Sequence, residues 1–187
     1  WLRDLGYNVF TTREPGGTGI GDQVRAILGN LDNTSMHPRT EILLFLSARA
    51  QLVEEVIRPM LAENVIILCD RYADSTLAYQ GYGHGVDLNT LRELLDFSTG
   101  KLYPDITFLF DIDIEKGLAR RRNSGGEWNR LDAYALAFHQ RVRNGYLALA
   151  AADPQRWITI NADQIVDQVQ LDLRKALTSR LSLSGPV

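Results

Sequence analysis

Charged side chains directly follow two short apolar runs of this chain of 187 residues. Arg13 lies just beyond the run Tyr7–Phe10, and Asp70 and Arg71 come directly after Val65–Cys69. A carboxylate at the end of a buried strand is costly unless it is paired, hydrogen-bonded or close to a cation. The guanidinium group of arginine is a planar fork suited to phosphate and carboxylate groups. These residue types therefore indicate an anion site, with capping of the local backbone by Asp70 and Arg71 as the alternative.

A turn-forming segment surrounds the first of these positions. Residues 12–17 read Thr-Arg-Glu-Pro-Gly-Gly, and a proline followed by paired glycines forces a tight turn before the next helix. Glu14 lies in this turn, where it could join a cluster of metal ion and water. Arg25 lies about two turns into the helix that follows. Taken alone the pattern is weak, because charged residues often cap the ends of strands.

The segment Pro38–Glu63 has the spacing of a long helix, and it carries an arginine among its apolar positions. Arg49 follows Phe45 at i+4 and Ile42 at i+7, within the apolar stripe. An arginine there must extend to solvent, pair with a carboxylate or face a ligand cavity. Phe45, one turn earlier, could stack on a planar base, whereas Phe45 without Arg49 beside it would be an ordinary core residue.

Three further residues follow Asp70 at helical spacing. Ser75, Tyr79 and Gln80 fall near one side of a helix and supply a hydroxyl group, an aromatic ring and an amide. An amide offers both a donor and an acceptor to the edge of a planar heterocycle. The segment after the second apolar run is therefore a candidate for recognition of a nucleotide base and sugar.

The stretch Arg120–Asp132 interrupts the regular pattern with a basic, glycine-containing insert. It reads RRRNSGGEWNRLD and includes Arg120, Arg122 and Arg130. One interpretation is a lid that closes on an anionic substrate, with its glycines as hinges. The other is a solvated loop, and the residue types leave both open.

Short apolar runs that alternate with longer helical patterns must position these side chains. The alternation predicts an α/β fold with a parallel sheet and helices on both sides. The expected strands are nearly continuous in apolar character, as in strands buried on both faces: Tyr7–Phe10, Val65–Cys69, Ile106–Phe110 and Trp157–Ile160. The expected helices are Gly19–Leu28, Pro38–Glu63, Leu88–Thr99, Ile114–Arg122, Ala133–Ala152 and Ile165–Leu183. The length predicts a single domain over residues 1–187.

Composition excludes several classes of protein. With 45% hydrophobic and 23% charged residues the chain can form a core, so wholesale disorder is excluded. No apolar run reaches the roughly 18 residues of a membrane helix. A net charge of −3 argues against a general nucleic-acid binder. The lone Cys69 excludes a disulfide framework and fits a reducing cytoplasm.

Taken together, these segments resemble the bacterial thymidylate kinases of the P-loop nucleoside-monophosphate kinase superfamily. The matching segments are TREPGG (12–17), FLSARAQ (45–51), DRYADSTLAYQG (70–81) and YPDITFLFDIDIEKGLARR (103–121), followed by the arginine-bearing insert 120–132. The resemblance implies a P-loop NTPase-like three-layer sandwich. It also implies transfer of the γ-phosphoryl group of ATP to dTMP with Mg²⁺, and a cytoplasmic homodimer without a nucleic-acid or membrane partner.

The resemblance assigns the base and the sugar to particular side chains. Phe45 would stack on thymine, and Arg49 would bond the carbonyl edge of the base. Ser75 and Gln80 would lie near the base and sugar, with Tyr79 packed under the deoxyribose.

The charged residues share a different implied task, which is to neutralise and orient phosphate groups. Those implied around the acceptor phosphate and its metal ion are Arg13, Arg25, Arg71, Glu14 and Asp70. Those implied around the phosphoryl group in transfer are the lid arginines Arg120, Arg122 and Arg130. Asp70, Arg71, Arg13 and Arg122 are the implied catalytic residues. The family commonly has an arginine directly before a lid glycine, where this chain has Ser124.

One family motif does not occur in this sequence. The family opens with a strand and a G-x-x-x-x-G-K-[ST] loop that cradles the donor phosphates, and the only Gly-Lys here, Gly100-Lys101, lacks that context. We therefore expect residues 1–187 to be an incomplete, inactive part of a kinase, with unpaired edges where the central strand would lie. The alternatives are a non-catalytic nucleotide-binding remnant and another nucleotide or nucleoside kinase of the superfamily.

Overall fold

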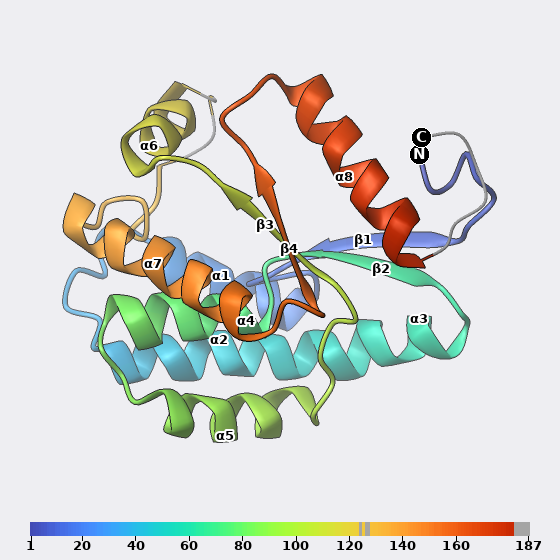
Figure 1. Cartoon of the computed structure of the whole chain (residues 1–187). Coiled ribbons are helices and arrows are strands. Elements are labelled where there is room, and N and C mark those ends of the chain that lie inside the picture. Colours follow the sequence, from blue (N-terminus) through green and yellow to red (C-terminus); the bar gives the residue numbers. More distant parts are fainter. Residues whose placement is uncertain (124, 126–127, 182–187) are drawn as a thin grey trace. The chain divides into compact units, whose positions relative to one another are not determined.

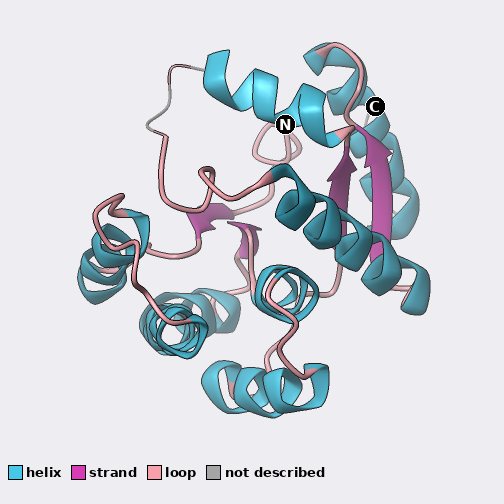
Figure 2. Cartoon of the chain, turned by 90° about the vertical axis from the view of Figure 1, so that its left-hand side faces the viewer, coloured by secondary structure: helices cyan, strands magenta, loops and turns pink. Residues whose placement is uncertain are grey.

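The computed structural model describes residues 1–123, 125 and 128–181, and the chain divides into two compact units. Unit 1 comprises Trp1–Tyr103 and Glu127–Gly145, and unit 2 comprises Pro104–Gly126 and Tyr146–Val187. Each unit contains a pair of parallel strands (Figures 1 and 2). The α/β class and the parallel strand pairing agree with the sequence pattern.

In unit 1 the strand β1 (Val9–Arg13) pairs in parallel with β2 (Ile66–Asp70). Val9 lies opposite Ile66, and Arg13 lies opposite Asp70. The carboxyl ends of both strands therefore meet at one edge. This register brings together the two charged positions that the sequence places after its apolar runs.

The helices of unit 1 lie against one another and against this strand pair. They are α1 (Gly19–Gly29), α2 (Pro38–Leu52), the π-helical segment η1 (Val53–Ile57), α3 (Arg58–Ala62), α4 (Ala73–Thr76), the π-helical segment η2 (Leu77–Gly83) and α5 (Leu88–Thr99). Helix α7 (Leu136–Ala152) contributes residues to both units. Side-chain oxygens begin two of these helices: Thr18 accepts from the backbone N–H of Gly21, and Asp87 accepts from that of Thr90.

The predicted long helix at 38–63 is continuous in the structure, since α2 passes through η1 into α3 (Figure 1). The apolar stripe of this helix forms the core of unit 1. Leu52, Val53 and Ile57 are buried together, with Ile67 and Cys69 of β2 packed against them. The stripe therefore fixes the orientation of α2 relative to the strands that carry the charged residues.

Unit 2 repeats the strand–helix arrangement. Its strands β3 (Thr107–Asp111) and β4 (Trp157–Asn161) pair in parallel, and the helix α8 (Val166–Leu181) packs against β4. Helix α6 (Ile114–Asn123) follows β3. The observed bounds lie close to the predicted ones, although β1 begins and ends later than Tyr7–Phe10.

One expectation about the strands is wrong. Leu68 in β2 is 45% exposed and Phe110 in β3 is 48% exposed, so these strands are not buried on both faces. The physical reason is that no described element covers these two side chains on the face to which they point, and each sheet has only two described strands. The single domain 1–187 stays a prediction. Residues 124, 126 and 127 of the insert 120–132 lie outside the described residues.

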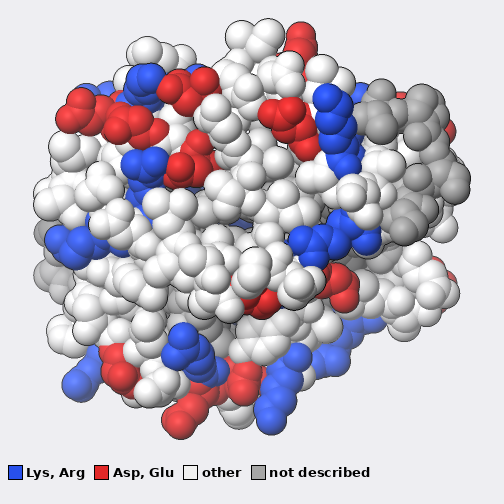
Figure 3. All heavy atoms as spheres, viewed as in Figure 1, with Lys and Arg blue, Asp and Glu red and all other residues white. Residues whose placement is uncertain are grey.

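The surface mixes charges of both signs. On the face drawn in Figure 3, the described Lys and Arg side chains are interspersed with Asp and Glu, in keeping with the net charge of −3. No helix among the described residues is long and apolar enough to cross a membrane.

Candidate active site

The turn after β1 is shaped by two glycines that no other residue could replace without a shift. Gly16 and Gly17 have φ values of 124° and 82°, which side chains rarely adopt. A Cβ atom on Gly17 would lie 2.5 Å from the Oγ1 atom of Thr12. The backbone N–H of Gly17 donates to Asp22 at 3.2 Å, and that of Glu14 donates to the carbonyl of Asp70 at 2.9 Å. The TREPGG segment is thus a fixed turn between β1 and α1.

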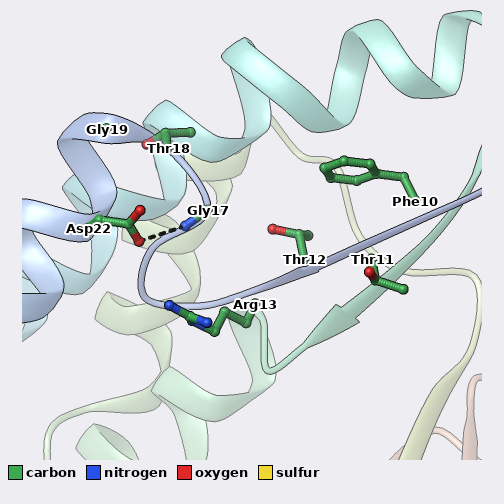
Figure 4. Close-up of a pocket in the computed structure, with 8 residues that line it drawn as sticks. All are labelled: Phe10, Thr11, Thr12, Arg13, Gly17, Thr18, Gly19 and Asp22. Carbon is green, nitrogen blue, oxygen red and sulfur yellow. Dashed lines mark hydrogen bonds between the residues drawn. The ribbon is translucent and has the colours of Figure 1, made fainter.

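This turn borders an open cavity of about 630 Å³. Figure 4 shows its lining residues on β1, the turn and the first residues of α1, with Arg13 beside Gly17: Phe10, Thr11, Thr12, Arg13, Gly17, Thr18, Gly19 and Asp22. The volume lies in the range of small-molecule sites. The cavity leaves room at the carboxyl end of β1, and its lining does not identify a ligand.

Three predicted arginines share one electrostatic neighbourhood at this end of the strands. Partial burial lowers the pKa of Arg25, and the positive charges of Arg13 and Arg71 lower it further, while Asp22 and Asp70 oppose this. Arg25 also donates to the carbonyl of Pro15 at 3.0 Å. Like charges that gather at an exposed site repel one another, and a bound anion would relieve the repulsion.

Arg71 has an unusual backbone conformation for its type. Its φ of 66° lies in the left-handed region, which is sparsely populated by residues other than glycine. Its guanidinium lies over the ring of Tyr79, 5.0 Å from the centroid. Such local strain is common where a side chain is held for a function. The pairing brings the predicted phosphate residue Arg71 and the predicted sugar residue Tyr79 together.

Arg49 is almost fully buried and is paired with a carboxylate. Its Nε and Nη2 atoms donate to Oε2 of Glu14 at 2.8 and 2.5 Å, and Nη1 donates to Oγ1 of Thr76 at 3.0 Å. Arg49 is 1% exposed and Glu14 is 4% exposed. Of the interpretations open for an arginine on an apolar stripe, the structure shows pairing. Thr76 was not singled out from the sequence.

The same pair bears on the predicted metal ligands. Both carboxylate oxygens of Glu14 accept hydrogen bonds from Arg49. Burial raises the pKa of Glu14 above its ordinary 4.5, and the charge of Arg49 opposes that rise. Asp70 is exposed at the end of β2. Among the described residues no group of three or more metal-ligating side chains occurs, so any metal ion here would depend on water and substrate oxygens.

Gln80 is buried and hydrogen-bonded to a residue that the sequence did not indicate. Its Nε2 donates to Oε1 of Glu41 at 2.7 Å, and both residues are 1% exposed. Glu41 lies on α2 directly before the buried Ile42. The available sequence signal was an acidic residue flanking an apolar stripe, which ordinarily indicates an exposed helix position.

Arg130 lies in unit 1 as a buried residue rather than an exposed lid side chain. Its Nη2 donates to Oε2 of Glu41 at 2.5 Å, its Nε to the carbonyl of Leu28 at 3.0 Å and its Nη1 to the hydroxyl of Tyr134 at 2.7 Å. It is 8% exposed. These contacts tie the segment after the insert to α1 and α2, which is a structural task that the sequence did not reveal.

The other two lid arginines belong to unit 2. Arg120 donates from Nη1 to the carbonyl of Ala162 at 2.6 Å and forms an ion pair with Asp163, with 3.7 Å between Nη2 and Oδ1. Arg122 is exposed near the end of α6.

Phe45 and Ser75 are half-buried in unit 1. Phe45 lies on α2 one turn before Arg49, and Ser75 lies in the short helix α4. Ser75 lies on α4, and Tyr79 and Gln80 lie on η2, which continues directly from α4. Their helical spacing agrees with the prediction.

Comparison with known proteins matches this chain to a family. The family model described as thymidylate kinase matches residues 1–173. A thymidylate kinase of Roseiflexus castenholzii is 54% identical over 173 residues, which cover 86% of this chain and 76% of that protein. A thymidylate kinase of Herpetosiphon aurantiacus is 45% identical over an alignment of 212 positions, which covers 98% of this chain and 90% of that protein. One of Nitratidesulfovibrio vulgaris is 46% identical over 187 residues, covering 97% and 87%.

Proposed function

Because the chain belongs to the thymidylate kinase family, we propose that it binds dTMP as the acceptor of the γ-phosphoryl group of ATP, giving dTDP. The observation that carries this proposal is the shared neighbourhood of Arg13, Arg25 and Arg71 beside the carboxyl ends of β1 and β2. In parallel α/β sheets, ligands bind beyond the carboxyl ends of strands. Three guanidinium groups there suit a phosphate monoester.

The base would be held by Phe45 and Arg49 of α2. An arginine has five N–H donors, and the hydrogen bonds of Arg49 to Glu14 and Thr76 use its Nε and one N–H on each terminal nitrogen. Each terminal nitrogen therefore keeps a further N–H for the carbonyl edge of a pyrimidine. The Glu14 pair holds the guanidinium in place, so little conformational entropy is lost on binding. Ser75, Tyr79 and Gln80 extend the same site toward the sugar.

Asp70 would orient the acceptor phosphate or hold Mg²⁺-bound water. Mg²⁺ supplies neutralisation of the phosphate charges when it is bound. The exposed carboxylate of Asp70 suits a metal ion that keeps most of its waters. We assign no metal oxygen to Glu14, because both of its oxygens accept from Arg49. Arg71 follows directly and places a positive charge next to the phosphate.

The donor side rests on fewer residues of this sequence. Arg120 and Arg122 of α6 are the candidates for contact with ATP and for neutralising the phosphoryl group in transfer, whereas Arg130 serves through its contacts within unit 1. A cytoplasmic homodimer completes the proposal.

Competitive nucleotide binding and turnover test this function. We expect dTMP to bind more tightly than dUMP, dCMP or dGMP in calorimetric titrations of the protein. ATP-dependent formation of dTDP would establish the kinase, whereas dTMP binding without turnover would favour a non-catalytic nucleotide-binding remnant. Preference for another monophosphate would favour a different kinase of the superfamily, and an absence of dTMP binding would refute the proposal.

A further inference from the structure

A second buried carboxylate lies on α2, about two turns before Arg49. Glu41 takes no part in the proposed contacts to dTMP, yet it is 1% exposed and is bonded on both oxygens. Its Oε1 accepts from Nε2 of Gln80 at 2.7 Å and lies 3.3 Å from Nε2 of His84. Its Oε2 accepts from Nη2 of Arg130 at 2.5 Å and from the hydroxyl of Tyr134 at 3.1 Å.

The chemistry of this carboxylate decides which way the amide of Gln80 turns. The two ends of an amide are nearly equal in size, and only their hydrogen bonding distinguishes them. An ionised carboxylate can accept but cannot donate. Glu41 therefore requires the Nε2 end of Gln80 to face it, and the carbonyl Oε1 must face the other way.

The carbonyl end of Gln80 is then an unused acceptor inside the molecule. Gln80 is 1% exposed, and no hydrogen bond to its Oε1 is found within the part of the chain that the structure describes. A ligand that brings an N–H group can therefore form a hydrogen bond with this acceptor. Thymine carries an N–H at ring position 3, whereas cytosine carries a bare acceptor nitrogen at that position.

We propose that Glu41 is a positioning residue that fixes the amide of Gln80 with its carbonyl toward the base, so that the site selects a pyrimidine with an N–H at position 3. This inference rests on the proposed function, because it takes Gln80 to face the base of dTMP. Glu41 does not touch the nucleotide. It acts through Gln80, and Arg130 and Tyr134 hold its second oxygen in place.

The charge state of Glu41 supports this role. Burial raises the pKa of Glu41, but the nearby His84, the hydrogen bonds from Gln80 and Arg130 and the charge of Arg130 outweigh burial and lower the pKa to about 2. The carboxylate is therefore ionised and unable to donate at neutral pH. Loss of the carboxylate, rather than a change of pH near neutrality, is the way to release the amide.

The variant Glu41→Gln tests the proposal, because Arg130 can only donate and keeps the new carbonyl oxygen on its side, so that the new N–H group faces Gln80. Gln80 then turns its own carbonyl toward residue 41, and its Nε2 can meet the acceptor nitrogen of cytosine. We expect the ratio of dCMP to dTMP dissociation constants, measured by calorimetric titration, to fall about tenfold or more, since a mispaired buried group is worth about 1–3 kcal/mol. A role in folding alone would weaken both ligands alike and leave the ratio unchanged.

Two matched variants complete the test. Glu41→Asp keeps an acceptor-only group and should retain more of the discrimination than Glu41→Gln. Glu93→Gln makes the same chemical change at an exposed position of α5 and should leave the ratio as in the unsubstituted protein. If Glu41→Gln does not fold, Gln80→Met removes the amide while it keeps the side-chain length, and the proposal requires the same fall in the ratio.

The outcomes separate this inference from the proposed function. If the unsubstituted protein does not prefer dTMP to dCMP, the proposed function fails. If it does, and the ratio persists in the folded variant Glu41→Gln, the positioning role of Glu41 is overturned. If the ratio persists in Gln80→Met, Gln80 does not read the base and the whole inference is overturned, while the proposed function stands.

Discussion

Two groups of arginines in unit 1 have opposite surroundings. Arg13, Arg25 and Arg71 are exposed near the carboxyl ends of β1 and β2, where their charges act on one another. Arg49 and Arg130 are buried, and each forms an ion pair with a carboxylate at 2.5 Å. The exposed arginines are accessible to an external anion, whereas the buried arginines pair with carboxylates of the protein.

This difference shows that arginine can serve both ligand recognition and stabilisation of the fold within one unit. A buried charge is tolerated only with a partner, so Arg49 and Arg130 constrain where Glu14 and Glu41 must lie. Exposed charges remain hydrated and cost little to keep, so these arginines stay accessible to a ligand. Arg49 joins both roles, because its partnered guanidinium keeps two N–H donors for the proposed base.

The largest expected effect comes from removing a buried arginine. Arg49→Ala leaves the carboxylate of Glu14 buried without its partner, and we expect a loss of about 3–5 kcal/mol in the free energy of unfolding. Urea denaturation measures this loss. Arg92→Ala, at an exposed position of α5, is the control and should change stability by no more than about 0.5 kcal/mol. Equal losses for the two variants would erase the distinction between buried and exposed arginines.

Acid should release the second buried pair. The pKa of Glu41 falls from an ordinary 4.5 to about 2 in the folded protein, so its stabilisation is complete above pH 4.5 and is lost as the pH falls toward 2. This shift in pKa corresponds to about 3 kcal/mol of the free energy of unfolding. Denaturation series from pH 6 to pH 3 should show this decline, and Glu41→Gln should flatten it. A stability that stays constant over this range would contradict the depressed pKa.

Removal of an exposed arginine should affect binding rather than stability. Arg25→Ala removes one charged donor from the proposed phosphate site, and we expect the free energy of dTMP binding to weaken by about 1–3 kcal/mol. Thymidine, which lacks the phosphate, serves as the control ligand and should bind as before. Equal weakening for both ligands in calorimetric titrations would remove Arg25 from the phosphate site.

The smallest expected effect comes from removing a neutral hydrogen-bond partner of a buried arginine. Thr76→Val keeps the shape of the side chain but removes the acceptor for Nη1 of Arg49. Because Glu14 still holds the guanidinium, we expect a loss of only about 1 kcal/mol in the free energy of unfolding. A loss as large as that of Arg49→Ala would mean that Thr76, rather than Glu14, is the main partner of Arg49.

Much of the fold followed from periodicity. The nearly continuous apolar runs located all the described strands to within a few residues, and the stripe from Ile42 to Met60 predicted one long helix. The burial of the strands was overestimated, because Leu68 and Phe110 remain exposed in two-stranded sheets. An apolar run shows that a strand can be covered on both faces, but it does not show that the described chain covers it.

The sequence by itself determined that Arg49 needs a partner, because an arginine among apolar helix positions cannot remain uncompensated. It also placed Arg13 and Asp70 at strand ends, where parallel pairing must bring them to one edge. Only the tertiary structure decided that the partner is Glu14, and that Glu41 joins Gln80 to Arg130. Those contacts link positions 35, 39 and 89 residues apart, and local spacing carries no information over such separations.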